Sequence, residues 1–285
     1  MGSPRNSDES STAIVLGELL GRGAYARVYE GTWDGKKAAI KKMTPFDPEH
    51  IKKYENEIRI MEELTKLRAP YIVEFYGAMC DEIQCLIAMQ HISGRSLMRY
   101  MTWNSGKPFT PLECYKILKQ LAHALMFLHK TAEIIHRDVN TANVFIDVDK
   151  GDIVLGDFGL AKKFEDLNKD IESTTIVGAP ACMAPEVILG ALYTPKSDIY
   201  SFGMVAWDLV DNGENDPYPS DNPYQIIRFV LKGQRPTIPV GCDDQLSKVI
   251  KRCWVQGPTL RPTAEQLLAD MDSLIEENES RRLKM

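Results

Sequence analysis

The spacing of apolar residues changes near residue 90, and this change restricts the folds that the chain can adopt. Before it, short runs of branched and aliphatic residues indicate strands around a single helix. The strand cores are Val15-Leu16, Val28-Tyr29, Ala38-Ala39-Ile40, Ile72-Val73 and Leu86-Ile87. After it, helical spacing covers Leu112 to Lys130, Ser197 to Asn212, Gln225 to Lys232 and Asp244 to Cys253. The pattern predicts an α+β chain with a small β-rich part and a larger helical part, joined at Gln90 to Gly94.

The helix within the β-rich part has a clear start. Asp47 suits the N-cap, and Pro48 suits the first helical position, where its missing N–H costs nothing. The predicted apolar stripe is Ile51, Ile58, Met61 and Leu64. Glu57 lies inside this helix, among acidic residues that are better explained as solvated charges.

Composition is typical of a soluble protein, with 285 residues of which 44% are hydrophobic and 26% charged. The net charge of −6 gives no sign of nucleic-acid binding, and no apolar run has the length of a membrane span. The six cysteines form neither a C-x-x-C pair nor a dense framework, so we expect them to be reduced in a cytoplasmic protein. We expect residues 1–12 to be a disordered lead or an expression remnant, and residues 276–285 a charged tail.

One short stretch carries the chemistry: His136-Arg137-Asp138, then Asn143, then Asp157-Phe158-Gly159. Transfer of a phosphoryl group from ATP needs a carboxylate that orients the attacking hydroxyl, and oxygen ligands that hold Mg²⁺ on the phosphates. Asp138 can fill the first role, and Asn143 and Asp157 can fill the second. Asp-Phe-Gly alone occurs by chance in many proteins, but the order and spacing of both pieces together do not.

This stretch resembles the catalytic loop and the magnesium loop of eukaryotic protein kinases. The resemblance covers nearly the whole chain and implies a bilobal kinase fold, with an N-lobe at residues 13–91 and a C-lobe at 92–275. Gly21 and Gly23 lie in a stretch similar to the glycine-rich loop that closes over phosphates, although Ala26 replaces its third glycine. Lys41 matches the lysine that contacts the α- and β-phosphates, and Glu57 matches the glutamate that pairs with it.

The same resemblance implies an adenine pocket between the lobes. Its expected residues are Val28 and Ala39 above the base, Phe145 below it, Met89 at the back, and the backbone of Gln90 and Ile92 along its edge. Each of the apolar residues could equally be ordinary core. The implied cofactors are ATP and Mg²⁺, with Mn²⁺ as an alternative metal.

Later landmarks follow in the kinase order. Ala184-Pro185-Glu186 matches the end of the activation segment, and Glu186 is expected to pair with Arg261. Asp198 is expected to brace the backbone of the catalytic loop. The segments around Ser201-Phe202-Gly203 and Cys253-Trp254 look most like the tyrosine-kinase-like group, whose members mostly phosphorylate Ser and Thr.

Two residues depart from the kinase pattern. Asn140 stands where Ser/Thr kinases usually carry lysine, and Ala179 where they usually carry threonine; Ala142 stands where tyrosine kinases often carry arginine. We expect a working protein kinase that phosphorylates Ser and Thr of proteins, with Tyr or both classes of hydroxyl as alternative acceptors. The alternatives are a pseudokinase that binds ATP or acts as a scaffold, and a small-molecule kinase, which the long activation segment disfavours.

Control by phosphorylation is expected from Arg137, since in the family such an arginine pairs with a phosphate on the activation segment. Three adjacent hydroxyl residues, Ser173, Thr174 and Thr175, lie in that segment, with Thr175 three residues before Gly178. They could also form only a polar loop. The expected partners are ATP and protein substrates, and a dimer for trans-autophosphorylation is an arrangement that the resemblance allows.

Overall fold

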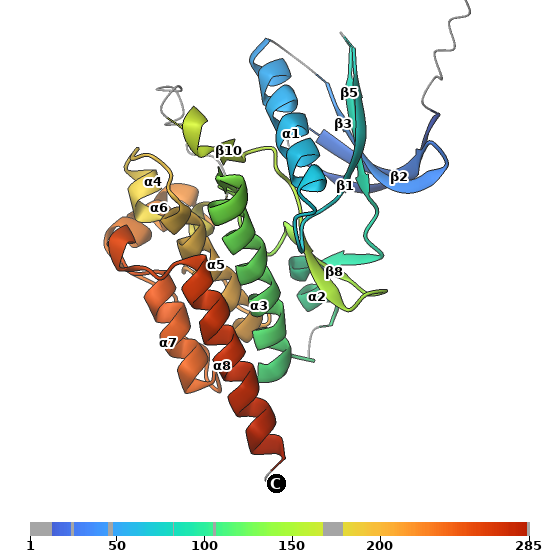
Figure 1. Ribbon diagram of the computed structural model, residues 1–285. Coiled ribbons are helices and arrows are strands. Elements are labelled where there is room, and N and C mark those ends of the chain that lie inside the picture. The colour runs from blue at the N-terminus through green and yellow to red at the C-terminus, as the bar shows by residue number, and fades with distance from the viewer. Residues whose placement is uncertain are drawn as a thin grey trace, which may run out of the picture. The chain divides into compact units, whose positions relative to one another are not determined.

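The computed structural model describes residues 13–23, 26–44, 48–81, 83–104, 107–167 and 179–283 (Figure 1). The predicted lead at 1–12, the predicted N-cap Asp47 and the hydroxyl residues Ser173, Thr174 and Thr175 lie outside these ranges. The chain forms two compact units. One holds the residues up to Tyr54 together with Glu74–His91, and the other holds Glu55–Val73 and the residues from Ile92 onward.

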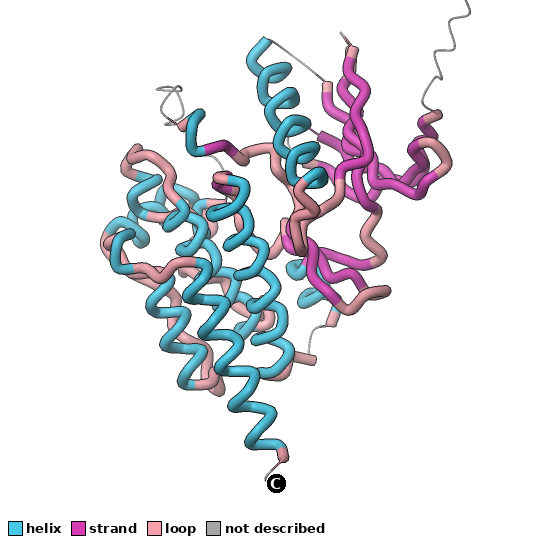
Figure 2. The backbone as a smooth tube through the Cα atoms, viewed as in Figure 1, coloured by secondary structure: helices cyan, strands magenta, loops and turns pink. Residues whose placement is uncertain are grey.

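A five-stranded antiparallel sheet makes up most of the first unit, which confirms the predicted β-rich part (Figure 2). Its strands are β1 (Ile14–Arg22), β2 (Ala26–Trp33), β3 (Lys36–Met43), β4 (Phe75–Cys80) and β5 (Cys85–Gln90), in the order β1-β2-β3-β5-β4. Asp34 and Gly35 join β2 to β3 with positive φ angles of 48° and 76°, as a tight hairpin of this Asp-Gly type requires.

The two faces of this sheet carry different residues because side chains alternate along each strand. One face buries an apolar core that contains Ala38, Ile40, Leu86 and Ala88. On the other face, Val28 pairs with Lys41 and Ala39 pairs with Met89. The sheet therefore gathers four of the predicted nucleotide-binding residues on one side.

Cys80 and Cys85 lie opposite each other on β4 and β5, with Cα atoms 4.0 Å apart, and are joined by a disulfide. The expectation of reduced cysteines is therefore wrong for this pair, although the other four are free. Spacing alone does not reveal the bond, because residues five apart meet only when a hairpin of the right register forms between them.

Helix α1 (Pro48–Lys66) forms where the sequence predicts it, but its buried stripe differs from the prediction. Met61 and Leu64 are buried, whereas Ile51 is 44% exposed and Ile58 is only partly buried. Tyr54 and Glu57 take their places on the buried face, because steps of three and four residues from Met61 lead to them. A stripe counted from aliphatic residues alone misses these two positions.

The second unit is mainly helical (Figure 2), as predicted. Its further helices are α2 (Leu97–Trp103), α3 (Pro111–Phe127), α4 (Pro185–Ile188), α5 (Pro195–Asp211), α6 (Pro223–Leu231), α7 (Asp244–Cys253) and α8 (Ala264–Arg282). Figure 1 shows α3 beside α8, and the predicted apolar face of Leu121, Leu125 and Leu128 is buried. Thr110 and Glu113 start α3 with a reciprocal capping box.

Small elements complete the second unit. A three-stranded sheet has the order β6 (Gly94–Ser96), β8 (Val144–Asp147) and β9 (Asp152–Leu155), while β7 (Ile134–Ile135) pairs with β10 (Lys162–Lys163). A π-helical turn at Leu128–Ala132 follows α3, and 3₁₀ turns lie at Phe164–Asp166, Pro180–Cys182 and Pro258–Leu260. None of the helices within the described ranges is long and apolar enough to cross a membrane.

The predicted strand at Ile72-Val73 is wrong. Ile72 makes only an isolated bridge to Leu155, and the N–H of Val73 donates to the Leu155 carbonyl at 3.0 Å, so both residues belong to the second unit. Their branched side chains are buried because they pack there, not because they lie in a strand. The predicted helical segments do not include α2, α4 or α8. The buried stripe of α8 is sparse and alternates with many charges.

A buried ion pair closes the helical unit, as the sequence predicts. The Arg261 guanidinium donates to both carboxylate oxygens of Glu186 at 2.6 and 2.7 Å, and its side chain is 0% exposed. It also donates to the carbonyl oxygens of Val255, Lys196 and Gln256. Because these bonds satisfy the guanidinium inside the protein, removing it leaves several acceptors without a donor.

Arg261→Ala should lower the free energy of unfolding by about 3–5 kcal/mol, since it leaves the Glu186 carboxylate, which is only 13% exposed, without its charged partner. Arg252 forms an exposed pair with Asp270 at 3.0 Å and provides a matched control. Arg252→Ala should cost only about 0–1 kcal/mol. Urea unfolding of both variants measures the difference, and equal losses would contradict the assigned role of Arg261.

Candidate functional site

The carboxylate of Asp198, in the first turn of α5, holds the loop that follows β7. Asp198 is 1% exposed, and it accepts the backbone N–H groups of His136 and Arg137, each at 2.9 Å. His129 Nε2 lies 2.8 Å from the same carboxylate. Burial by itself would raise the pKa of Asp198, but the bonds from His129 and the loop hold that pKa below its ordinary value. The predicted brace is confirmed, while the part played by His129 was missed.

The ring of His136 joins the loop to the end of β9. Its Nε2 lies 3.0 Å from the carbonyl oxygen of Gly156, and the N–H of Asp138 donates to its Nδ1 at 3.3 Å. These contacts require a proton on Nε2 and an unprotonated Nδ1. The ring also packs edge-on against Phe158, with 4.9 Å between the ring centroids. Two distant pieces of the predicted motif are thus brought together.

The Asp138 carboxylate is fixed by two side-chain amides. Asn143 Nδ2 donates to one oxygen at 2.8 Å, and Asn140 Nδ2 donates to the other at 3.0 Å. Burial raises the pKa of Asp138, and the nearby Asp157 carboxylate acts in the same direction. The structure therefore brings three of the predicted site residues into contact, and the Asp138 carboxylate lies between the neutral amides of Asn140 and Asn143.

Asn140 also shapes the loop itself. Its Oδ1 accepts the backbone N–H groups of Ala142 and Asn143 at 2.9 and 3.2 Å. An aliphatic lysine side chain has no acceptor that could make these two bonds. The departure from the kinase pattern thus has a local structural effect, because Asn140 folds the turn that presents Asn143.

Asp157 and Asn143 are suited to a hard divalent cation. Asp157 directly follows Gly156 at the end of β9, with a φ of 57°, and its Oδ1 accepts the N–H of Gly159 at 3.3 Å. Mg²⁺ prefers oxygen ligands and usually takes one or two from the protein and the rest from phosphates and water. Among the described residues there is no group of three His, Cys, Asp or Glu that could hold a metal.

Glu57 is 2% exposed on α1, and three contacts fix this part of the helix to the chain after Phe158. Asn56 Nδ2 donates to the Ala161 carbonyl at 2.9 Å. Arg59 pairs with Asp166, and Lys163 pairs with Glu63, both at 2.7 Å. The position of Glu57 is therefore linked to the Ala161–Asp166 stretch within the second unit.

The predicted nucleotide-binding residues are divided between the units. Gly21, Gly23, Val28, Ala39, Lys41, Met89 and Gln90 lie in the first unit, and Glu57, Ile92 and Phe145 lie in the second. The Gln90 N–H donates to Glu74, and the Ile92 carbonyl accepts from Gly94, both at 2.8 Å. The Gln90 N–H is thus already used, whereas the Ile92 carbonyl oxygen has a second lone pair that could accept a hydrogen bond from a base. The pairing of Lys41 with Glu57 stays a prediction.

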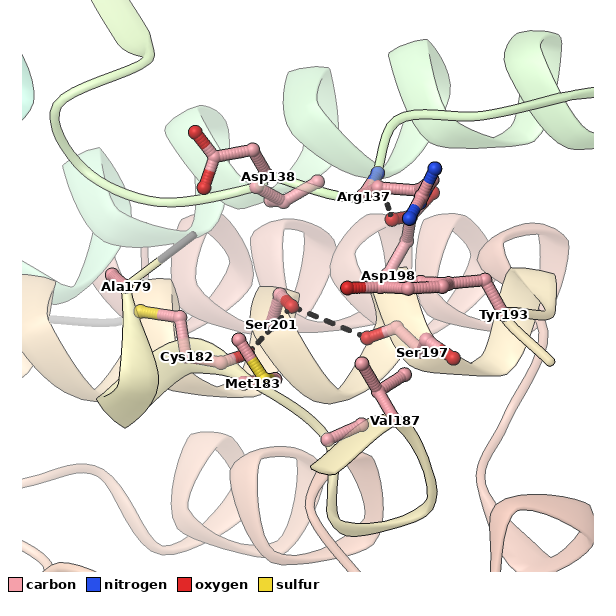
Figure 3. Close-up of a pocket in the computed structure, with 12 residues that line it drawn as sticks. Arg137, Asp138, Ala179, Cys182, Met183, Val187, Tyr193, Ser197, Asp198 and Ser201 are labelled. Atoms are coloured by element: carbon pink, nitrogen blue, oxygen red, sulfur yellow. Dashed lines mark hydrogen bonds between the residues drawn. The ribbon is translucent and has the colours of Figure 1, made fainter. Parts of the chain in front are cut away.

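Arg137 lies in a small pocket beside Asp138, with Ala179, Cys182 and Tyr193 also on its walls (Figure 3). The guanidinium carbon is 4.0 Å from the centre of the Tyr193 ring, a cation–π contact. Arg137 Nε and the Tyr193 hydroxyl are buried without a hydrogen-bond partner among the described residues. The stack holds the arginine in place, and sequence reasoning missed Tyr193 because it lies 56 positions away in the chain.

A second carboxylate on α5, that of Asp208, contacts the loop between β7 and β8. The Thr141 hydroxyl donates to Asp208 Oδ2 at 3.1 Å. Burial raises the pKa of Asp208 from 3.8 to about 6, and Asp211 nearby also raises it. Because the folded form holds its proton more tightly than the unfolded form, this carboxyl stabilises the fold less as the pH rises from about 4 to about 6.

Asp208→Asn should remove this pH dependence while keeping an acceptor for Thr141. The stability of the variant relative to the unmodified protein should rise by about 2 kcal/mol between about pH 4 and pH 7. Denaturant unfolding across that range measures the change. Parallel stability curves for the two proteins would show that Asp208 is not the group that titrates.

The fold and the loop define a protein kinase domain, with a five-stranded antiparallel N-lobe sheet and a helical C-lobe. A family model described as protein tyrosine and serine/threonine kinase matches residues 14–271. The chain therefore belongs to this family. The narrower tyrosine-kinase-like group stays a prediction.

Relatives in Dictyostelium discoideum agree with this. The probable serine/threonine-protein kinase drkD is 31% identical over 93% of this chain and 20% of its own length. A probable LIM domain-containing serine/threonine-protein kinase is 31% identical over 96% of this chain and 41% of its own length. The dual specificity protein kinase pyk3 is 30% identical over 92% and 18%. The chain thus spans less than half the length of these relatives.

Proposed function

We propose that this chain is an active protein kinase that transfers the ATP γ-phosphate to hydroxyl groups of protein substrates, mainly on Ser and Thr. The observation that carries the proposal is the Asp138 carboxylate, which Asn140 and Asn143 hold at 3.0 and 2.8 Å. A raised pKa makes this carboxylate a better base for a hydroxyl proton.

In the proposed reaction, Asp138 orients the substrate hydroxyl and accepts its proton as the oxygen attacks the γ-phosphorus. The bond from the γ-phosphorus to the bridging oxygen breaks, and ADP leaves. Lys41, held by Glu57, would contact the α- and β-phosphates, while Val28, Ala39 and Phe145 would enclose the base. The Asp198 carboxylate, which accepts the backbone N–H groups of His136 and Arg137, keeps the loop in place throughout.

Asn143 and Asp157 would hold Mg²⁺ on the phosphates, through the side-chain oxygen of the amide and the carboxylate. The ion would supply countercharge for the transferred group. Mn²⁺ is an alternative, because it accepts the same oxygen ligands.

The alternative proposal is a pseudokinase that binds ATP or acts as a scaffold. Asn140 and Ala179 favour it, since they remove a lysine and a threonine that Ser/Thr kinases usually place near the transferred phosphate. Loss of one preorganised donor typically costs about 2.7–4 kcal/mol of barrier, which slows a reaction without abolishing it. The contact of Asn140 with Asp138 supports the active form, because it keeps a donor on the catalytic carboxylate.

Asp138→Asn should lower the rate of phosphate transfer by about 10²–10⁴-fold and leave ATP binding intact. Transfer from labelled ATP to a generic protein substrate measures the rate, and the melting shift caused by ATP measures binding. Asp149→Asn, the same change at an exposed turn position, is the control and should keep the full rate. Near-full turnover by Asp138→Asn would exclude the proposed base, and an inactive unmodified protein that still binds ATP would favour the pseudokinase.

The acceptor hydroxyl is proposed from the family group and from relatives named as Ser/Thr kinases. One relative is named as dual specificity, and Asn140 and Ala179 leave Tyr as a second acceptor. Phosphoamino-acid analysis of the autophosphorylated protein distinguishes these outcomes.

Activation is proposed to need a phosphate on the segment that contains Thr175. The supporting observation is Arg137, whose backbone is bonded to Asp198 and whose guanidinium is stacked on Tyr193. A guanidinium that is already ordered loses little entropy when it pairs with a phosphate. Such a phosphate adds a charge of about −1.5 to −2 and can order a loop against this arginine.

Thr175→Ala should lower the activity of the phosphorylated enzyme more than Thr174→Ala, its adjacent control. Arg137→Ala should make the phosphorylated and dephosphorylated forms equally active, because the phosphate then lacks its partner. Initial rates before and after phosphatase treatment provide the measurement. If phosphatase leaves the rate of the unmodified enzyme unchanged, this form of control is absent.

A further inference from the structure

We propose that Cys80 and Cys85 form a reversible thiol–disulfide site. Cys80 exchanges with low-molecular-weight disulfides such as glutathione disulfide, and Cys85 then resolves the mixed disulfide. Cys80 ends β4, Cys85 begins β5, and the two are joined in the structure. The site lies wholly within the first unit, and neither cysteine is among the residues proposed for phosphate transfer.

The fold holds the two cysteines together by bonds that do not involve sulfur. The Asp81 N–H donates to the Gln84 carbonyl at 2.9 Å. The Asp81 side chain accepts the N–H groups of Ile83 and Gln84 at 2.7 and 2.8 Å. Beyond this turn the strands remain paired as far as Phe75 and Met89. The reduced thiols therefore stay close, which favours closure of the bond within one molecule.

The two cysteines differ in exposure. Cys80 is an exposed residue at the end of its strand, whereas Cys85 is 2% exposed. On this ground a molecule the size of glutathione should reach Cys80 more easily than Cys85. This asymmetry assigns the entering role to Cys80 and the resolving role to Cys85.

The other four cysteines are poor competitors. Cys114 and Cys253 are buried. Burial raises the pKa of Cys114 to about 12 and of Cys242 to about 11, and it also raises the pKa of Cys182 and Cys253. Since the thiolate is the nucleophile in disulfide exchange, these groups react slowly. Oxidation should thus be confined to the hairpin pair.

The exchange is balanced in two steps. The Cys80 thiolate attacks glutathione disulfide, forms a mixed disulfide and releases one glutathione thiolate, which takes up the proton that Cys80 lost. The Cys85 thiolate attacks Cys80 Sγ and releases the second glutathione, which takes up the proton from Cys85. Two protein thiols are oxidised to one disulfide, and one glutathione disulfide is reduced to two glutathione molecules.

The test starts from the fully reduced chain and equilibrates it with graded ratios of glutathione to glutathione disulfide. Alkylation of the remaining thiols and peptide mass mapping then locate each oxidised residue. We expect Cys80 and Cys85 to lose their thiols together while the other four stay alkylated. The oxidised chain should melt about 4 °C above the reduced chain, because the closed loop limits the unfolded state.

Two variants test the assigned roles. Cys85→Ala should accumulate one glutathione on Cys80, and Cys80→Ala should gain none on Cys85. Cys242→Ala is the control, and in this variant the thiols of Cys80 and Cys85 should still be oxidised together. The proposal would be overturned if all six cysteines were still free to be alkylated after equilibration at the most oxidising ratio. It would also be overturned if Cys182 or Cys242 were oxidised to the same extent as Cys80 and Cys85. If a variant fails to fold, the unmodified chain still tests the proposal, because the thiols of Cys80 and Cys85 must be lost together there.

Discussion

The buried carboxylate of Asp198 accepts hydrogen bonds from two consecutive backbone N–H groups and from His129, and the rest of the site depends on this arrangement. A carboxylate that is 1% exposed would be costly if unpaired, so the loop and α5 stabilise each other. The bond to the N–H of Arg137 fixes the backbone on which both Arg137 and Asp138 are presented. Arg137 has a φ of 70°, a conformation that needs such support in a residue with a Cβ. Asp138, proposed for catalysis, and Arg137, proposed for regulation, thus share one anchor.

The structure shows contacts of Asn140 that the resemblance to kinases does not predict. Asn140 stands where Ser/Thr kinases usually carry a lysine, and the absence of that positive charge counts against catalysis. In the loop it donates to Asp138 and accepts from the backbone of Ala142 and Asn143. The same side chain therefore orders the proposed base and the proposed metal ligand. Asn140 thus lacks the charge of a lysine but makes hydrogen bonds that order the groups around it.

The parts of the fold that follow from local pattern could be predicted from the sequence. Apolar periodicity indicated the β3 and β5 strands and helices α3, α5, α6 and α7. The spacing of the motif residues pointed to Asp138 and Asn143, and the resemblance to kinases pointed to Asp198. Other features depend on contacts that no local pattern encodes. Ile72 has a strand-like side chain but packs against Leu155 of another segment. Tyr193 meets Arg137, and Cys80 meets Cys85, only after distant or facing backbone has been placed. The predicted stripe of α1 differs from the observed one because the buried face includes Tyr54 and Glu57, which a count of aliphatic residues omits.

The hydrogen bonds of the His136 ring run in one direction. The Asp138 N–H donates into one nitrogen, and the other nitrogen donates to the Gly156 carbonyl. Only a neutral imidazole can accept and donate at these two ends, since the charged ring has two N–H groups and no acceptor. The ring therefore links the loop before β8 to the residues after β9 in a fixed order of donor and acceptor, and a side chain at position 136 that lacked either function would break one of the two links.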